Sequence, residues 1–247
     1  MAVDVNTVYQ RVLAIANKEQ RGYITPQEFN LFANQAQMKI FEQYFYDLNQ
    51  FKRLPGHNAE DVDVVSIIQE KITKFYKYLA AVEPESDGDL DLSASTLSDI
   101  YRLVEVRINY DTTDSTYIQN IAEEITLQDH RYQEFGPLTE PTLSRPVFKR
   151  YETTLRGYPT PNAASYPNSK YYLTYIKAPA QVNWNYNIVV GQALYNASAS
   201  SDFELHRSEE TSLVNEILRL AGIMMEKPNL SAAADREEDK KTLNEKR

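Results

Sequence analysis

The segment 17–29, NKEQRGYITPQEF, matches the calcium-binding EF-hand loop at its most visible positions. Gly22 falls on the sharp-turn position and Glu28 on the bidentate position. The fifth position of the loop, however, holds Arg21, whose guanidinium repels a cation and offers it no lone pair. A helix start explains these residues better, because Thr25 as N-cap, a proline directly after it and Glu28 three residues later form a capping box. We predict a capped helix here and no calcium site.

The acidic run EPESDGDLDL, residues 83–92, is a second candidate for cation binding. Carboxylates at alternate positions could converge on a hard cation. They belong to Glu83, Glu85, Asp87, Asp89 and Asp91. Counted from Asp87, the sixth position of a calcium loop requires glycine, and Leu92 stands there. We therefore favour a solvated linker, and a metal-dependent enzyme that uses these carboxylates remains one alternative.

The three histidines, His57, His130 and His206, form no recognisable catalytic motif. Glu134 follows His130 by four residues and Glu210 follows His206 by four, but neither pair makes the HExxH signature of zinc proteases. The GxSxG, Walker and GxGxxG motifs are absent, and the chain has no cysteine. We predict a protein that is not an enzyme and that has no catalytic residue, no metal ligand and no cofactor.

Composition restricts the partners of this chain of 247 residues. Lys and Arg number 26 against 35 Asp and Glu, a net charge of −9, so the chain lacks the basic excess that binds a phosphate backbone. The N-terminus has no cationic start followed by an apolar run, and no apolar stretch approaches the roughly 20 residues that cross a bilayer. We expect a soluble chain made in a cytoplasm.

Apolar residues at helical spacing predict four helices. They cover residues 4–18, 26–51, 61–81 and 208–226. In the second helix, Phe41, Phe45 and Tyr46 widen the apolar stripe beyond what one partner helix needs. This helix is therefore expected to contact neighbours on more than one side.

The middle of the chain has the pattern of strands. Residues 101–110 alternate with strand period, residues 117–134 fit a polar helix, and the tyrosine-rich runs 171–176 and 184–190 fit antiparallel strands. The chain holds 18 tyrosines. Tyrosine suits a surface that a partner covers, and it equally suits half-buried positions of a sheet, so both interpretations stay open.

Together these patterns predict an α+β fold with five segments. They are a helical unit at 1–82, an acidic linker at 83–99, a β-rich lobe with one polar helix at 100–206, a C-terminal helix at 207–228 that packs back on the helical unit, and a flexible charged arm at 229–247.

Three stretches of the sequence carry a resemblance to a known family. They are NTVYQRVLAIANKEQRGYITPQEFNLFANQAQMKIFEQYFYDLNQF at 6–51, EEITLQDHRYQEFGPLTEPTLSRPVF at 123–148, and the later runs YYLTYIKAPAQVNW and FELHRSEETSLVNEILRLAGI, which extend to residue 223. The chain resembles virion proteins encoded by crAss-like and related marine tailed bacteriophages. The resemblance implies a structural protein of the virion neck or tail, made in the bacterial host cytoplasm. It implies a helical bundle, a β-rich lobe and a C-terminal arm that inserts into a neighbour.

The resemblance also implies partners. The chain is expected to be a head–tail connector or adaptor, arranged with copies of itself in a dodecameric ring, in contact with the portal protein and other neck or tail proteins. Genomic DNA would pass through that ring without sequence-specific binding, which a net negative charge suits. The alternative from the binding class is a monomeric accessory or decoration protein of the virion, or one that binds the host surface through its tyrosine-rich lobe.

The candidate functional residues are therefore interfacial. The predicted oligomer interface consists of Phe41, Phe45 and Tyr46 on the second helix, and Tyr171, Tyr172 and Trp184 on the β-rich lobe. The predicted docking arm contains Ser231, Arg236, Lys240 and Lys241.

Overall fold

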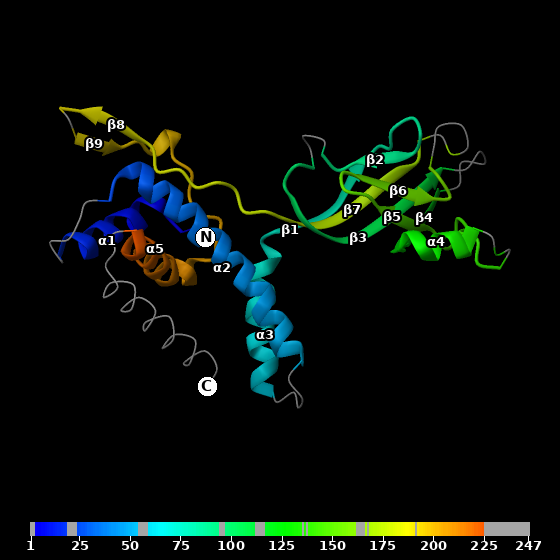
Figure 1. Cartoon of the computed structure of the whole chain (residues 1–247), viewed down its shortest axis with the longest axis horizontal. Coiled ribbons are helices and arrows are strands. Elements are labelled where there is room, and N and C mark those ends of the chain that lie inside the picture. The colour runs from blue at the N-terminus through cyan, green and yellow to red at the C-terminus, as the bar shows by residue number, and fades with distance from the viewer. Residues whose placement is uncertain are drawn as a thin grey trace. The chain divides into compact units, whose positions relative to one another are not determined.

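The chain folds into two compact units of α+β structure (Figure 1). A computed structural model describes residues 3–18, 24–53, 59–93, 97–111, 117–134, 136, 138–161, 166, 168–190 and 192–224. One unit, here the helical unit, comprises residues 1–74 and 179–247, and the other, the β-rich unit, comprises residues 75–178. The predicted fold class is confirmed: N-terminal helices, a curled mixed β-sheet and a C-terminal helix.

Within the described residues, the helical unit combines four α-helices with a β-hairpin. Its elements are α1 (Val5–Lys18), α2 (Pro26–Arg53), α3 (Ala59–Thr73), β8 (Tyr186–Val189), β9 (Gln192–Tyr195), the 3-10 helices η1 (Ala197–Ala199) and η2 (Arg207–Glu209), and α5 (Glu210–Met224). Helix α5 packs against both α1 and α2, and α3 packs against α2.

The start of α2 is the predicted capping box. The backbone N–H and the hydroxyl of Thr25 donate to Glu28 Oε2 at 2.9 and 2.8 Å, and the backbone N–H of Glu28 donates to Thr25 Oγ1 at 3.3 Å. These bonds satisfy donors that a helix start leaves free. From there α2 buries one stripe at helical spacing, formed by Phe29, Ala33, Ala36, Phe41 and Tyr44. Helix α5 also has a buried apolar face, formed by Leu213, Val214, Ile217, Leu218 and Ala221.

The β-rich unit is built on a seven-stranded sheet in the order β1-β7-β3-β4-β5-β6-β2. Its elements are β1 (Tyr76–Val82), β2 (Asp89–Asp91), β3 (Ile100–Asp111), β4 (Tyr117–Glu124), α4 (Leu127–Glu134), β5 (Val147–Arg150), β6 (Thr154–Tyr158) and β7 (Lys170–Lys177). The β4–β5 pair is parallel, and the other pairs are antiparallel. Alternate residues of β3, Val106, Ile108 and Tyr110, enter a core shared with Phe148, Leu155 and Leu173.

Two predicted helices are wrong in part, since each ends in or begins with a strand. The helix expected over 61–81 stops at Thr73, and 76–82 form β1, which pairs with β7. The helix expected over 117–134 begins only at Leu127, because 117–124 form β4 and pair with β3. In both segments pairing with a distant strand decides the structure, and local periodicity does not report it.

The predicted segment boundaries also differ from the observed units. Residues 89–91, inside the expected acidic linker, form β2 and pair with β6. The β-rich unit ends at residue 178, not 206, and the β8–β9 hairpin belongs to the helical unit. The arm expected at 229–247, with Ser231, Arg236, Lys240 and Lys241, lies outside the described residues.

Candidate functional site

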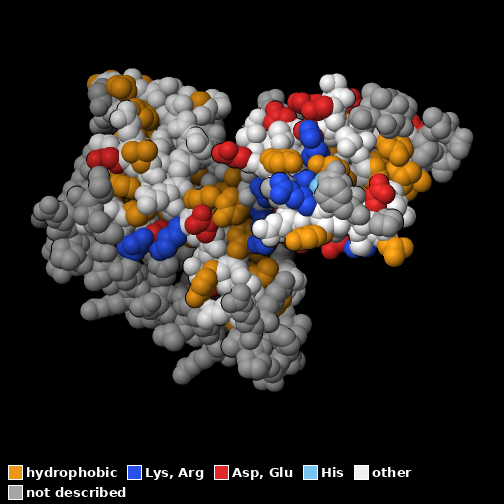
Figure 2. Space-filling view, turned by 45° about the vertical axis from the view of Figure 1, so that its right-hand side comes forward, with side chains coloured by type: hydrophobic (Ala, Val, Ile, Leu, Met, Phe, Trp, Pro, Cys, Tyr) orange, Lys and Arg blue, Asp and Glu red, His pale blue; other side chains and the backbone are white. Residues whose placement is uncertain are grey.

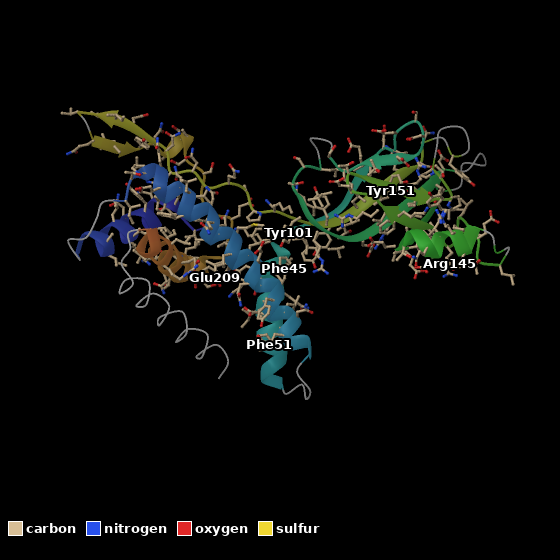
Figure 3. The ribbon with its side chains drawn as sticks, in the orientation of Figure 1. Phe45, Phe51, Tyr101, Arg145, Tyr151 and Glu209 are labelled. Carbon is tan, nitrogen blue, oxygen red and sulfur yellow. The ribbon has the colours of Figure 1, made fainter. Side chains whose placement is uncertain are left out.

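The six predicted interface residues do not form one surface. Phe41, Tyr171 and Trp184 are buried inside their own units, which corrects their assignment to an oligomer interface, because they present no surface to a partner. Phe45 and Tyr172 are half-buried, and Tyr46 is 64% exposed. Figure 3 shows Phe45 on α2 in the helical unit, whereas the two tyrosines 171 and 172 lie on β7 of the β-rich unit.

Trp184 is the aromatic anchor of the β8–β9 hairpin. Its ring lies 4.2 Å from that of Tyr9 on α1, and 5.7 and 5.8 Å from those of Tyr186 and Tyr195 at the base of the hairpin. Its indole N–H donates to Asn6 Oδ1 at 3.2 Å. The base of the hairpin is therefore fixed to α1 by a stack of aromatic rings.

Amide side chains of α2 hold the strand-like segment that leads into the hairpin. Asn34 Nδ2 donates to the Val182 carbonyl at 2.9 Å, and its Oδ1 accepts from the Val182 N–H at 2.8 Å. Asn30 makes the same two contacts with the backbone of Trp184, at 3.2 and 2.8 Å. Gln37 Nε2 donates to the Ala180 carbonyl at 2.7 Å. These three amides pair with the segment as a neighbouring strand would, so its course along α2 is specified residue by residue.

The end of the hairpin exposes apolar side chains on both faces. The hairpin tip, defined as Ile188, Val189, Val190 and Leu194, is exposed throughout, with Ile188 at 73% and Val190 at 98%. Val190 also has a backbone φ of 51°, a region that β-branched residues rarely adopt. Figure 2 shows hydrophobic side chains among uncharged ones at the upper left, where the hairpin lies in Figure 1. The tip is thus an apolar projection on a well-anchored base.

The acidic residues of 83–91 act as structural ion pairs and turn caps. Arg156 on β6 grips Asp89 with two hydrogen bonds, one from Nη2 to Oδ2 at 2.6 Å and one from Nε to Oδ1. Glu83 lies 3.1 Å from Lys170 Nζ. The Ser93 hydroxyl and N–H donate to Asp91 and hold the pKa of that carboxyl below its ordinary value. Across the described residues, no group of three or more His, Asp or Glu side chains is placed to hold a metal ion.

The two described histidines also have local structural contacts. His130 on α4 is buried with its ring 4.2 Å from that of Tyr158. His206 Nδ1 accepts from the Ser208 N–H at 3.3 Å and caps η2, while Glu210 lies 2.9 Å from Arg11 Nη1. His57 lies outside the described residues. His206 and Glu210 thus bind different partners, and the side chain of Glu134 lies outside the described part of the chain.

Two buried carboxylates in the helical unit are held by cations. Glu209 Oε1 lies 2.6 Å from Lys71 Nζ; Figure 3 shows Glu209 beside α5. Burial alone would raise the pKa of Glu216, but hydrogen bonds from Arg219 and, at 2.8 Å, from Lys39 outweigh it and hold that pKa below its ordinary value. Both carboxylates tie α5 and its N-terminal turn to α2 and α3.

Buried tyrosine hydroxyls fasten the β-rich unit from inside. Tyr171 OH accepts from the Gly157 N–H and donates to the Gly88 carbonyl, both at 2.9 Å. A Cβ at Gly157 would lie 2.8 Å from that hydroxyl, so the close approach requires glycine. Tyr110 OH donates to the Pro159 carbonyl at 2.7 Å. Burial raises the pKa of both phenols, which therefore stay neutral donors.

No family model matches the sequence, and neither does any curated protein at a significant level. No helix in the described ranges is long and apolar enough to span a membrane. Most of the carboxylates and histidines singled out in the sequence make internal contacts, namely Glu83, Asp87, Asp89, Asp91, His130, His206 and Glu210. Exposed apolar side chains occur at several places in the described chain, and the hairpin tip brings four of them together on one element. Periodicity alone did not reveal the tip, and the absence of charge from residues 178–201 was the available signal.

Proposed function

We propose that this chain is a structural subunit of a bacteriophage virion, one copy of a homo-oligomeric ring in the head–tail connector between portal and tail. The observation that carries the proposal is the anchored hairpin with its exposed apolar tip. A rigid base with outward apolar residues is suited to protein contact. The family resemblance supports the connector role, because it implies a helical bundle and a β-rich lobe, and the chain has a helical unit and a β-rich unit.

The use of the polar residues supports assembly over catalysis. Glu209, Glu216 and Asp89 are each committed to a lysine or arginine of their own unit. Such ion pairs fix one element against another and leave these carboxylates without a free role as acid or base. A net charge of −9 fits a ring through which DNA passes without binding.

The test is the size of the purified full chain, alone and mixed with the portal protein of the same phage. Sedimentation velocity over a range of concentrations is expected to show a closed oligomer in at least one of the two samples. A chain that stays monomeric in both would contradict the ring.

A monomeric accessory or host-binding protein is the second candidate. The near-complete exposure of Val190 favours it to the same extent as a ring, because an apolar tip can meet any protein surface. A monomer that still co-purifies with virions, or binds host cells, would support this candidate instead.

A further inference from the structure

We propose that the β8–β9 hairpin is the element through which one copy of this chain binds a second copy. The apolar tip and the two strand edges of the hairpin would pack against the neighbour. This inference rests on the proposed assembly function and names the surface that carries it.

Both faces of the hairpin carry exposed apolar side chains. Ile188 lies opposite Ala193, on the face that carries Tyr186 and Tyr195 at its base, whereas Val189 and Leu194 lie on the other face. Ile188 is 73% exposed and Leu194 is 51% exposed. A hairpin resting on its own unit would cover one face, so exposure of both indicates insertion between surfaces that a partner supplies.

The hairpin lies in a segment of the chain that has no charged residue. Two copies of a chain with net charge −9 repel each other, and a contact between them is favoured where the surface has no charge. Residues 178–201 contain no Asp, Glu, Lys, Arg or His, the longest such stretch in the sequence. The hairpin lies in the middle of this stretch. The chain therefore presents its apolar tip on a surface where a like-charged copy can approach.

The outer edges of β8 and β9 are open to pairing with another strand. Among the described residues the hairpin is a separate two-stranded sheet, so β8 and β9 each have one edge that pairs with no other described strand. Exposed edges are normally protected by lysine, proline or a bulge, and the sequences YNIV and QALY contain no charged residue and no proline. Pairing of β8 in one copy with β9 in the next is head-to-tail, and such a contact can repeat around a closed ring.

The backbone of Val190, at the end of the hairpin, is strained. Its φ of 51° suits glycine or asparagine, yet the position holds a β-branched residue that is 98% exposed. Within the chain this valine costs backbone energy and covers nothing. A contact with a second copy would use its side chain.

The base of the hairpin is held in place by contacts within its own unit. The Trp184 ring packs against those of Tyr9, Tyr186 and Tyr195, and the amide of Asn30 binds the backbone of Trp184. A pre-organised element loses little conformational entropy when it binds. The hairpin can therefore provide affinity without a prior ordering step.

The test compares the self-association of full-length variants by sedimentation velocity, under the conditions in which the wild type assembles. The double variant Ile188→Lys with Leu194→Lys puts charge on both exposed faces, and we expect its association to weaken by at least about tenfold. The control is Leu138→Lys in the β-rich unit, where the side chain is 98% exposed, and we expect it to assemble as the wild type does. Equal assembly of the double variant and the control would overturn the inference while leaving the ring itself intact.

Val190→Asn separates contact from folding. Asparagine tolerates the positive φ, so we expect a higher midpoint of thermal unfolding together with weaker association. Higher stability with unchanged association would overturn the role of the tip. A wild type that never associates would overturn both this inference and the ring. Binding of the wild type to uncharged phosphatidylcholine vesicles, lost in the lysine variant and without self-association, would assign the hairpin to lipid and would also overturn the inference.

Discussion

The seven-stranded sheet of the β-rich unit buries its apolar side chains, whereas the β8–β9 hairpin of the helical unit exposes them at its tip. In the sheet, Tyr110 and Tyr171 point inward and their hydroxyls are bound to backbone groups. In the hairpin, Ile188 and Leu194 point outward on opposite faces. The sheet is thus stabilised by its own core. The hairpin depends on the helical unit for its position and leaves its apolar residues exposed.

The edges of the two structures differ in the same way. Strand β2 at one end of the sheet carries Asp89 and Asp91, which are bound by Arg156 and Ser93. Charge and polar pairing at an edge disfavour addition of another strand. Strands β8 and β9 carry no charged residue and no proline. Their edges therefore lack the feature that disfavours strand addition at β2.

Removal of the hairpin anchor should have the largest effect. Trp184→Ala leaves a cavity between α1 and the hairpin, and we expect the free energy of unfolding of the helical unit to fall by about 3–5 kcal/mol. Urea denaturation followed by far-UV circular dichroism measures it. The control is Tyr46→Ala, an exposed aromatic residue of the same unit, with an expected loss within about 1 kcal/mol. Equal losses in the two variants would contradict the anchor role.

Removal of one hydroxyl from the sheet core should have the next largest effect. Tyr171→Phe leaves the Gly157 N–H and the Gly88 carbonyl buried without that partner, so we expect a loss of about 2–4 kcal/mol in the β-rich unit. The single Trp of the chain lies in the helical unit, and its fluorescence transition should stay in place. Tyr172→Phe is the control, because in the described part of the chain its hydroxyl makes no hydrogen bond. A shift of the fluorescence transition as large as the dichroism shift would show that the units do not unfold separately.

Acid should weaken the helical unit through Glu216. The folded pKa of this carboxyl lies below the unfolded one, so its contribution is complete above the unfolded pKa of about 4.3 and is lost as the pH falls through the folded pKa. Glu216→Gln should cost about 2 kcal/mol at pH 7. Unfolding followed by Trp184 fluorescence from neutral to acidic pH should show the gap to wild type closing. A gap that stays constant, or Glu42→Gln behaving identically, would be inconsistent with this ion pair.

The start of α2 should show the smallest effect. Thr25→Ala removes the hydroxyl from the capping box, with an expected loss of about 1 kcal/mol in the helical unit. Thr25→Ser keeps an oxygen at the same place and should restore most of it. Thermal unfolding monitored by Trp184 fluorescence distinguishes the two. If serine is no better than alanine, the cap does not stabilise this helix.

Much of the fold could be predicted from local pattern. Helices α1, α2 and α5 and strands β3 and β7 follow from periodicity, and Thr25 with Glu28 predicted the start of α2. Strands β1 and β4 could not be found in the same way, because their short aromatic and aliphatic runs fit a helix or a strand until the pairing partner is known. Such pairing is a property of distant sequence.

The candidate site was harder to predict, since aromatic residues look the same in a core and in an interface. Phe41 and Trp184 fit the pattern of interface anchors, yet both are buried within the helical unit. The amide stripe of Asn30, Asn34 and Gln37 on α2 was the local sign that a backbone segment lies there. Polar residues at helical spacing beside an apolar stripe can thus mark an internal partner.

The insertion of the β-rich unit sets an order of events during synthesis. Its residues, 75–178, are contiguous and leave the ribosome before the segment that completes the helical core. The N–H of Val5 is bound by Asp202, 197 positions later, and Val3 pairs with Phe203. The N-terminal helices must therefore wait for the last third of the chain, whereas the β-rich unit can fold first. Trp184 meets Tyr9 only at that late stage, so the hairpin takes its position when the chain is nearly finished.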